Sequence, residues 1–142
     1  MTNNVNSAMQ KLQILMDANM DKARSALKDI AQELTEETKR TITDQTESWP
    51  PLNPITLAHK APETRILIDT GIMLDSITNK QINENTYTIG VHRDARSERG
   101  DIAALMESGD NSQNLPPRPF MAPTMKRVRE DLAAKLRNNL GL

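Results

Sequence analysis

Apolar residues recur every three or four positions across the first third of the chain, which is the spacing of an amphipathic helix. No Pro or Gly interrupts residues 5–42, so the pattern predicts one long helix. At 1.5 Å per residue, about 36 residues span roughly 54 Å, whereas a compact domain of this size has a radius of gyration of about 15 Å. The apolar positions are Val5, Met9, Leu12, Met16, Met20, Ala23, Leu27, Ile30, Leu34 and Ile42, with Thr38 bridging the widest gap.

The predicted helix is therefore too long to lie wholly on its own domain. It must protrude, break once, or pack on a neighbouring subunit. Two interpretations stay open at this point. The helix is either an amphipathic element lying along the core of its own chain or a docking arm for a neighbour.

Four prolines mark residues 48–62 as a loop, because proline lacks an amide donor and keeps its predecessor out of the helical region. Within this loop, residues 55–60 are expected to form a short helical turn. A loop of this length with its own apolar groups is unusual in a compact domain. We therefore expect it to fold against the body through its apolar side chains, Trp49, Leu52, Ile55 and Leu57.

After the loop the pattern changes from a helical period to a period of two. Asp69 or Thr70 is positioned to cap a short helix over residues 71–76. Residues 77–82 and 86–91 flank the polar turn 83–85, which predicts an antiparallel hairpin. A lone hairpin is only marginally stable, so it must pack on a helix or join another sheet. The buried side of the short helix is expected to comprise Leu67, Ile68, Ile72, Met73 and Ile77.

The last third of the chain predicts one short and one longer helix. Residues 92–100 are strongly polar and are expected to form a mobile loop. Asp101 can cap a short helix over residues 102–107 that ends at Gly109. The final helix is expected to begin near Pro123, a residue suited to a first turn. Its predicted apolar stripe comprises Met125, Val128, Leu132, Leu136 and Leu140.

Together these elements predict a single α+β domain. It comprises a long N-terminal helix over residues 1–44, a core of loop, short helices and β-hairpin over residues 45–122, and a C-terminal helix over residues 123–142. The 142 residues suit one domain.

Composition narrows the function classes. Lys and Arg number 18 against 19 Asp and Glu, so net charge favours neither nucleic acid nor an anionic membrane. No apolar stretch approaches the roughly 18 residues of a membrane span, and the N-terminus lacks a signal-peptide pattern. Only one Trp, one Tyr and one Phe are present. The core is therefore expected to be thin, and oligomerisation would add buried area.

Candidate catalytic chemistry is sparse. The chain has no Cys, which excludes a thiolate nucleophile or a Cys-ligated metal. His59 and His92 stand 33 residues apart, and only Asp94 lies near enough to His92 to suggest half of a metal site. Asp69 is more simply a helix cap than a nucleophilic carboxylate. We therefore expect no catalytic residues, no cofactor and no metal, with a small metal-dependent hydrolase kept as a remote alternative.

The C-terminal helix offers a rival hypothesis, because its polar face is basic. A basic helix face can bind phosphates without reading sequence, yet aromatic residues for base stacking are nearly absent. Cations near a helix C-terminus are also favoured by the helix dipole alone. The candidate contacts to DNA or to an acidic partner are Lys126, Arg127, Arg129, Lys135 and Arg137.

Three ordered motifs carry a resemblance over residues 45–140. SWPPL at Ser48–Leu52 is followed by Thr56 and Lys60, LIDTGIMLDSI spans Leu67–Ile77, and LPPRPF spans Leu115–Phe120. The order of these motifs resembles the tail-completion (virion-morphogenesis) family of tailed bacteriophages. That family typically has a Leu-x-x-Thr-Gly-x-Leu-x-x-Ser-Ile element. This chain departs from it either by one extra residue between Gly71 and Leu74 or by having Met73 at the Leu position with Asp75 out of step. It also has a short helix ending in Glu and Gly, near which Ala104, Glu107 and Gly109 stand without the usual preceding His or Tyr.

The resemblance implies a non-enzymatic virion protein that completes or terminates the tail, or joins tail to head at the neck. It implies a self-assembling ring, usually a hexamer, whose partners are neighbouring neck or tail-tube proteins and which has no contact with membrane. Such a protein is made in the bacterial cytoplasm and ends in the virion. The alternative is a DNA-contacting protein of the portal channel that uses the basic helix.

Two scarce aromatic residues lie in the Pro-rich motifs of this resemblance. Large rings in such loops are either loop anchors or interface anchors, and Arg118 is expected to form a bidentate pair with an acidic group of its own or a neighbouring chain. The long helix and the edge of the hairpin are further candidates for contacts between subunits. The proposed subunit or partner interface comprises Trp49, Leu52, Arg118, Pro119 and Phe120.

Overall fold

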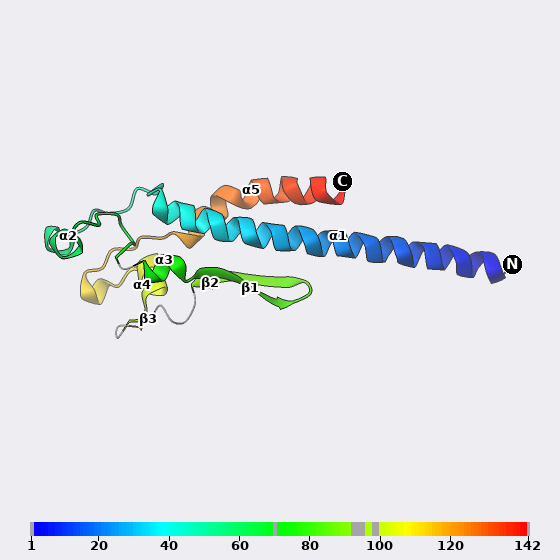
Figure 1. Cartoon of the computed structure of the whole chain (residues 1–142), viewed down its shortest axis with the longest axis horizontal. Helices are drawn as coiled ribbons and strands as arrows, with labels where there is room; N and C mark the ends of the chain where they lie inside the picture. The colour runs from blue at the N-terminus through cyan, green and yellow to red at the C-terminus, as the bar shows by residue number, and fades with distance from the viewer. Residues whose placement is uncertain (1, 70, 92–95, 98–99, 142) are drawn as a thin grey trace.

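The fold is known from a computed structural model that describes residues 2–69, 71–91, 96–97 and 100–141. It is an α+β arrangement built on one long helix, α1 (Thr2–Thr43), whose N-terminal part extends well beyond the other elements (Figure 1). The 42 residues of α1 form one unbroken helix. Of the three expected outcomes for this segment, the helix therefore protrudes from its own domain.

Two elements cover the C-terminal half of α1 on different sides. Figure 1 shows α5 (Met121–Leu140) running back along one side and the hairpin of β1 (Ile77–Asn83) and β2 (Thr86–Val91) along the other. The hairpin is antiparallel, with Ile77 opposite Val91 and a register shift near the turn between Gln81 and Asn83. The predicted hairpin is thus confirmed, and it packs on a helix as its marginal stability requires.

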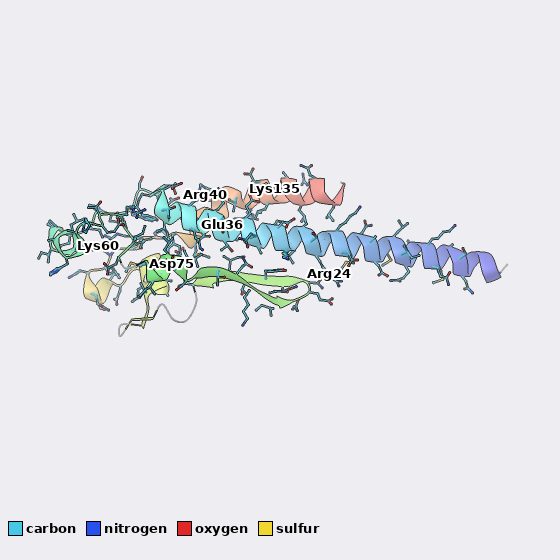
Figure 2. The ribbon with its side chains drawn as sticks, viewed as in Figure 1. Arg24, Glu36, Arg40, Lys60, Asp75 and Lys135 are labelled. Atoms are coloured by element: carbon cyan, nitrogen blue, oxygen red, sulfur yellow. The ribbon has the colours of Figure 1, made fainter. Side chains whose placement is uncertain are left out.

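Polar contacts fasten the hairpin to α1 at two levels. Asn79 donates its amide to Thr35 at 3.0 Å and to Gln32 at 3.3 Å. At the tip, the guanidinium of Arg24 pairs with Glu84 at 2.9 Å and donates to Asn85 at 3.2 Å. Figure 2 labels Arg24 on α1 at the level of this tip.

The connecting segment contains short helices at the end of the molecule opposite the N-terminus. The Pro-rich loop contains α2 (Pro54–Lys60), which confirms the helical turn predicted over residues 55–60. The side chain of Asn53 caps this helix. The loop folds on the body through Trp49, Leu52 and Leu57, which are half-buried, but Ile55 is exposed, so its predicted anchoring role is wrong.

Helix α3 (Ile72–Asp75) precedes β1. Its N-cap is Gly71 at φ 85°, with no side-chain cap. The prediction that Asp69 caps this helix is therefore wrong, and Thr70 lies outside the described residues. Gly71 takes the position because a left-handed φ at the helix entry suits glycine. Of the residues predicted to be buried here, Ile72 is exposed.

Helix α4 (Ile102–Ser108) follows a two-residue pairing of β3 (Arg96–Ser97) with β4 (Gly100–Asp101). The prediction of a loop over residues 92–100 is therefore wrong at Arg96, Ser97 and Gly100, which are paired. Residues 92–95 and 98–99, which were predicted to be mobile, lie outside the described residues. The side chain of Asp101, the predicted cap of α4, also lies outside the described part of the chain. After α4, Asp110 pairs with Leu115 across the 3-10 helix η2 (Asn111–Gln113).

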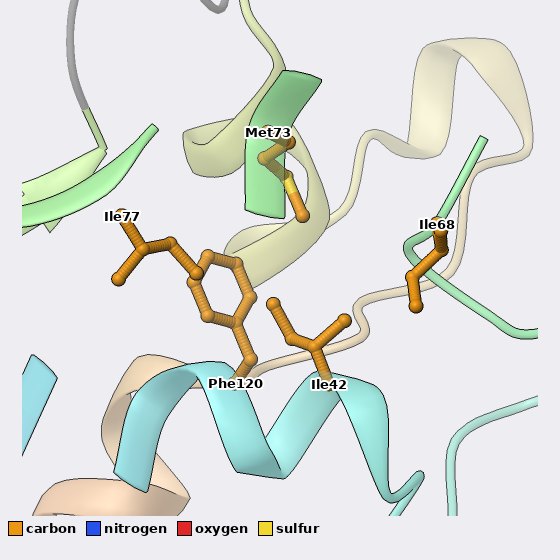
Figure 3. Packing of buried hydrophobic residues seen from close by; sticks show 5 residues of the cluster. All are labelled: Ile42, Ile68, Met73, Ile77 and Phe120. Atoms are coloured by element: carbon orange, nitrogen blue, oxygen red, sulfur yellow. The ribbon is translucent and has the colours of Figure 1, made fainter. Parts of the chain in front are cut away.

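The apolar core sits where α1, α3, β1 and the start of α5 meet. Five buried side chains form it, and Figure 3 shows the Phe120 ring among the other four. The core is thin, as the shortage of aromatic residues predicts. Its members are Ile42, Ile68, Met73, Ile77 and Phe120.

Helix α5 begins at Met121, two residues before the predicted start, and its buried face is only partly the predicted one, since Val128 is buried and Leu132 and Leu140 are half-buried. Thr124 and Val128 are buried, whereas Met125 and Leu136 expose 45% and 37% of their surface. The predicted stripe is therefore wrong for Met125 and Leu136. The spacing of apolar residues could not identify the buried face of α5, because the polar Thr124 lies on that face.

Candidate functional site

The SWPPL loop and the LPPRPF turn are bonded to each other, although about 70 residues separate them. The indole of Trp49 donates to the carbonyl oxygen of Pro119 at 2.7 Å. In the other direction, Arg118 donates from Nε to the carbonyl of Pro50 and from a terminal nitrogen to that of Pro51, each at 3.0 Å. Each motif thus supplies both donors and acceptors to the other.

Pro117 and Pro119 restrict the backbone on either side of Arg118, and its side chain donates to two carbonyls of the other loop. Its residue surface is 5% exposed. The prediction of a bidentate pair with an acidic group of its own chain is therefore wrong, because the acceptors are two carbonyl oxygens. Burial lowers the pKa of the Arg118 guanidinium, which nevertheless stays charged because arginine titrates far above neutral pH.

Glu107 at the end of α4 holds the start of α5. Its carboxylate accepts hydrogen bonds from the backbone amides of Phe120, Met121 and Ala122 at 2.8–3.0 Å. These amides belong to the first turn of a helix, where no intrahelical carbonyl is available. A carboxylate there is also favoured by the helix dipole. Glu107 therefore replaces the side-chain cap that Phe120 cannot supply.

Gly109 makes the turn between α4 and the RPF segment possible. Its φ is 70°, and a Cβ built there would lie 2.7 Å from the Leu115 carbonyl oxygen and from the Pro117 nitrogen. The same turn is closed by a hydrogen bond from the amide of Arg118 to the carbonyl of Met106 at 2.6 Å. The close approach requires glycine at position 109. The Glu and Gly near the end of α4 thus both act on the RPF turn.

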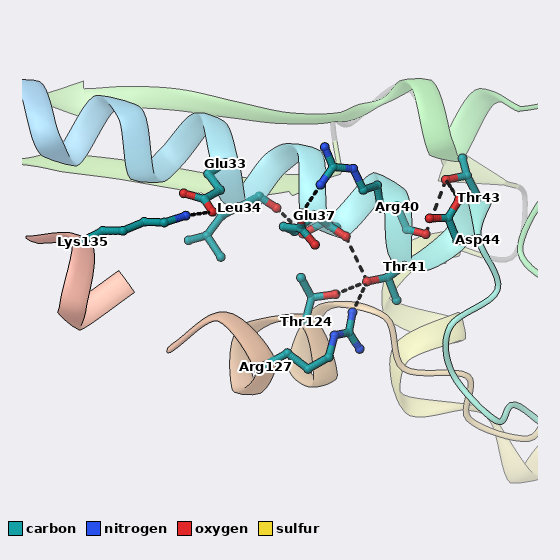
Figure 4. Close-up of polar contacts among 11 residues, drawn as sticks. Glu33, Leu34, Glu37, Arg40, Thr41, Thr43, Asp44, Thr124, Arg127 and Lys135 are labelled. Atoms are coloured by element: carbon teal, nitrogen blue, oxygen red, sulfur yellow. Dashed lines mark hydrogen bonds and ion pairs between the residues drawn. The ribbon is translucent and has the colours of Figure 1, made fainter. Parts of the chain in front are cut away.

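A chain of hydrogen bonds through two buried threonines joins α1 to α5 (Figure 4). Arg127 donates to the Thr41 hydroxyl at 2.5 Å, the hydroxyls of Thr41 and Thr124 lie 2.6 Å apart, and Thr124 donates to the Phe120 carbonyl at 2.6 Å. Thr41 and Thr124 are both fully buried. Sequence reasoning missed this pair, although threonines at positions 35, 38 and 41 on the buried side of a helix were a usable signal.

All five basic residues of α5 are exposed, and two of them form ion pairs with carboxylates of the same chain. Arg127 also pairs with Glu47, and Lys135 pairs with Glu33 on α1, an ion pair that raises the pKa of Lys135. These two therefore fasten α5 to the rest of the chain. Lys126, Arg129 and Arg137 are exposed on α5.

A cavity of about 1320 Å³ lies between the α2 loop and the turn after α4. Its lining includes His59, Lys60, Asp69 and Arg118. Lys60 donates to the carbonyl of Arg65 at 2.6 Å, and burial lowers its pKa, an effect opposed by the nearby charges of Asp69 and Glu63. Lys60 and Arg118 thus both donate hydrogen bonds to loop carbonyls at the wall of the cavity.

No group of three or more metal-ligating side chains occurs in the part of the chain that the structure describes. His59 lines the cavity, and the candidate pair His92 and Asp94 lies outside the described residues. None of the described helices is both long and apolar enough to cross a membrane.

The predicted interface residues thus lie together where the two loops meet. Their contacts there are mainly with residues of the same chain. Phe120 is 1% exposed in the core, whereas Trp49, Leu52 and Pro119 are half-buried. Comparison of the chain with protein-family models, with curated proteins and with solved structures gave no match.

Proposed function

We propose that this chain is a structural virion protein of a tailed phage, which completes or terminates the tail or joins it to the head at the neck. It acts by binding, without chemistry, as a ring of identical subunits that docks on a neighbouring ring or tail tube. It is made in the host cytoplasm and ends in the virion.

The observation that carries this proposal is the convergence of the three motifs. Trp49 of the first motif and Arg118 of the third bind each other's loops, and Ile68, Met73 and Ile77 of the second pack against Phe120. Segments that are separated in sequence but bonded in space behave as one unit. The three motifs that carry the resemblance to the tail-completion family therefore also meet in one structural junction of this chain.

The shape of the chain supports an assembly role. A well-fastened body carries a helix that extends beyond it (Figure 1), and apolar side chains on that helix are exposed. Large exposed apolar patches mark interaction sites in soluble proteins. A chain that offers such a surface is suited to binding other subunits.

The proposal is tested in the virus that encodes the chain. Purified particles should contain its peptides in a fixed ratio to the portal protein, and tail-tube and portal genes should flank its own. Removing the gene should yield separate heads and tails or tails of irregular length. Particles that form normally, infect normally and lack the chain would exclude a virion role.

A DNA-contacting role is the second candidate, because Lys126, Arg129 and Arg137 are exposed on one helix. It is the weaker one, since Arg127 and Lys135 are engaged by carboxylates of the same chain. Fluorescence anisotropy with a duplex at low ionic strength separates the two. Binding that falls steeply with salt and is lost in a K126E/R129E variant would favour DNA contact, and no binding at low salt would remove it.

A further inference from the structure

The N-terminal half of α1 carries an apolar seam that no part of the described chain covers. Val5, Met9, Leu12 and Met16 follow one another at steps of four, three and four, and they expose 55–65% of their surface. Met20 continues the seam at 44%. We call residues 5–20 the arm. In Figure 2 its side chains stand clear of the other elements.

The seam lies on the face that α5 covers further along the same helix. Steps of seven residues lead from Met20 through Leu27 and Leu34 to Thr41, and positions seven apart share one side of a helix. Leu34 is 5% exposed, and Thr41 meets Thr124 of α5. The arm is therefore a continuation of a helix-packing surface, and what it lacks is the second helix.

The arm cannot turn back onto its own α5. It is part of one continuous helix, and residues 5–42 contain no Pro or Gly at which that helix would break. Helix α5 runs along the opposite half of α1, so the arm points away from it (Figure 1). A helix that covers the arm must therefore come from another molecule.

Helix α5 has an exposed surface that, like the arm, carries a row of apolar side chains. A shallow groove of about 470 Å³ on α5 is lined by Met125, Lys126, Arg129 and Leu132, and Leu136 follows one turn later. Met125 and Leu136 are partly exposed, and they are the two stripe residues that α1 leaves uncovered. The groove thus presents its own apolar seam, at positions 125, 132 and 136.

One flank of each surface is complementary in charge. Asp17 lies beside the arm's seam and Asp21 follows one turn later, so that flank is acidic, whereas Lys11 and Lys22 lie on the other flank. The α5 groove includes the cations of Lys126 and Arg129 in its wall. Opposite charges beside two apolar seams fix the orientation in which helices pair.

We propose that the arm of one copy of this chain packs into the α5 groove of a second copy. This contact rests on the proposed ring and names the surfaces that would build it. Arm and groove are different surfaces on different parts of the molecule (Figure 1). Where two copies do not exchange arms reciprocally, the contact is head-to-tail and leaves a free arm on one copy and a free groove on the other. Repetition of such a contact closes a ring when the rotation permits.

Two matched variants test the contribution of the arm. Leu12 lies on the seam at 58% exposure, and Ile14 lies on the opposite side of the same helix at 67%. In sedimentation velocity the unmodified chain should form oligomers, L12E should sediment as the 15.9 kDa monomer, and I14E should behave as the unmodified chain. Both positions are exposed, and matching circular dichroism of the two variants checks that folding is unchanged.

Disulfide trapping tests the groove, because the chain has no cysteine of its own. Met16→Cys and Leu132→Cys are made in separate chains, mixed and oxidised. A disulfide between the two variants, absent for either alone and absent when Ile14→Cys replaces Met16→Cys, supports the contact. A Met16→Cys chain that links only to itself would instead show arm-to-arm pairing and overturn it.

The outcomes separate this contact from the proposed function. Oligomers that persist in L12E leave the ring intact and overturn the arm as its contact. A chain that remains monomeric at every concentration also overturns the contact, whereas the virion role is judged by the presence of the chain in particles. A groove that binds duplex DNA in place of the arm, with no cross-link to Met16→Cys, overturns the contact as well.

Discussion

The indole nitrogen of Trp49 lies 2.7 Å from the carbonyl oxygen of Pro119, a residue 70 positions later. Arg118, the neighbour of Pro119, returns two hydrogen bonds to the loop that follows Trp49. Each of the two loops therefore donates hydrogen bonds to the other. Loss of one partner therefore leaves groups of the other without a bond, and this raises the cost of any substitution there.

Arg118→Ala is expected to lower the free energy of unfolding by about 3 kcal/mol, since it removes two charge-assisted hydrogen bonds and leaves two loop carbonyls unpaired. Urea denaturation of the two proteins measures the difference. Arg129→Ala, a change at an exposed arginine of α5, should alter stability by less than about 0.5 kcal/mol. Equal values for the two variants would mean that the Arg118 bonds do not stabilise the fold.

Glu107→Gln is expected to lower the free energy of unfolding by about 1 kcal/mol, and Glu107→Ala by about 2 kcal/mol. Gln keeps one acceptor but loses the charge that favours a helix N-terminus, whereas Ala leaves the amides of Phe120, Met121 and Ala122 without the carboxylate. Thermal unfolding followed by circular dichroism checks the order. Glu36→Gln, on the exposed surface of α1, is the control, and a control loss as large as that of Glu107→Gln would contradict the prediction.

Gly109→Ala is expected to destabilise the fold by about 3 kcal/mol or more, because both the positive φ and the close approach of backbone atoms exclude a Cβ. Gly90→Ala is the matched control. A Cβ at Gly90 meets nothing within 4 Å, so that change should be tolerated. Chemical denaturation of both variants provides the comparison, and similar midpoints would show that the turn relaxes around the added methyl group.

The carboxyl group of Glu63 should titrate with a pKa of about 2, below its ordinary 4.5, because Arg65 donates to it from its side chain and its backbone. A lowered pKa means that the folded chain binds this proton more weakly than the unfolded chain. The pair therefore contributes stability above pH 4.5 and loses it as the pH falls toward 2. Side-chain NMR titration measures the value, and in Arg65→Ala it should rise part of the way toward 4.5, because the backbone donor remains; an unchanged value would exclude the Arg65 side chain as a cause.

Local patterns were sufficient for most of the secondary structure. The three-and-four spacing, free of Pro and Gly, predicted α1, and the change to a period of two around Asn83-Glu84-Asn85 predicted the hairpin. Both signals depend on neighbours within a few residues, so a sequence pattern contains them. The start of α5 was displaced by two residues because Glu107, a residue of another helix, caps it.

The candidate site was only partly predictable. Trp49, Arg118 and Phe120 stood out because aromatic residues are scarce and prolines surround them. Their partners could not be derived, since a hydrogen bond from Arg118 to the carbonyl of Pro50 joins two loops whose meeting depends on the whole chain path. The same limit applies to Thr41 and Thr124, whose hydroxyls are satisfied only because α5 returns along α1.

The sequence by itself determined that α1 is one long helix with an apolar seam, because helical period and backbone propensity are local properties. Only the tertiary structure decided which part of that seam is covered. Helix α5 and the hairpin reach the C-terminal half of α1, which buries Leu34, and Met9 and Leu12 remain exposed beyond them. Which residues of α1 are buried depends on how far α5 and the hairpin extend along it. That extent is set by the folded chain and not by the local sequence.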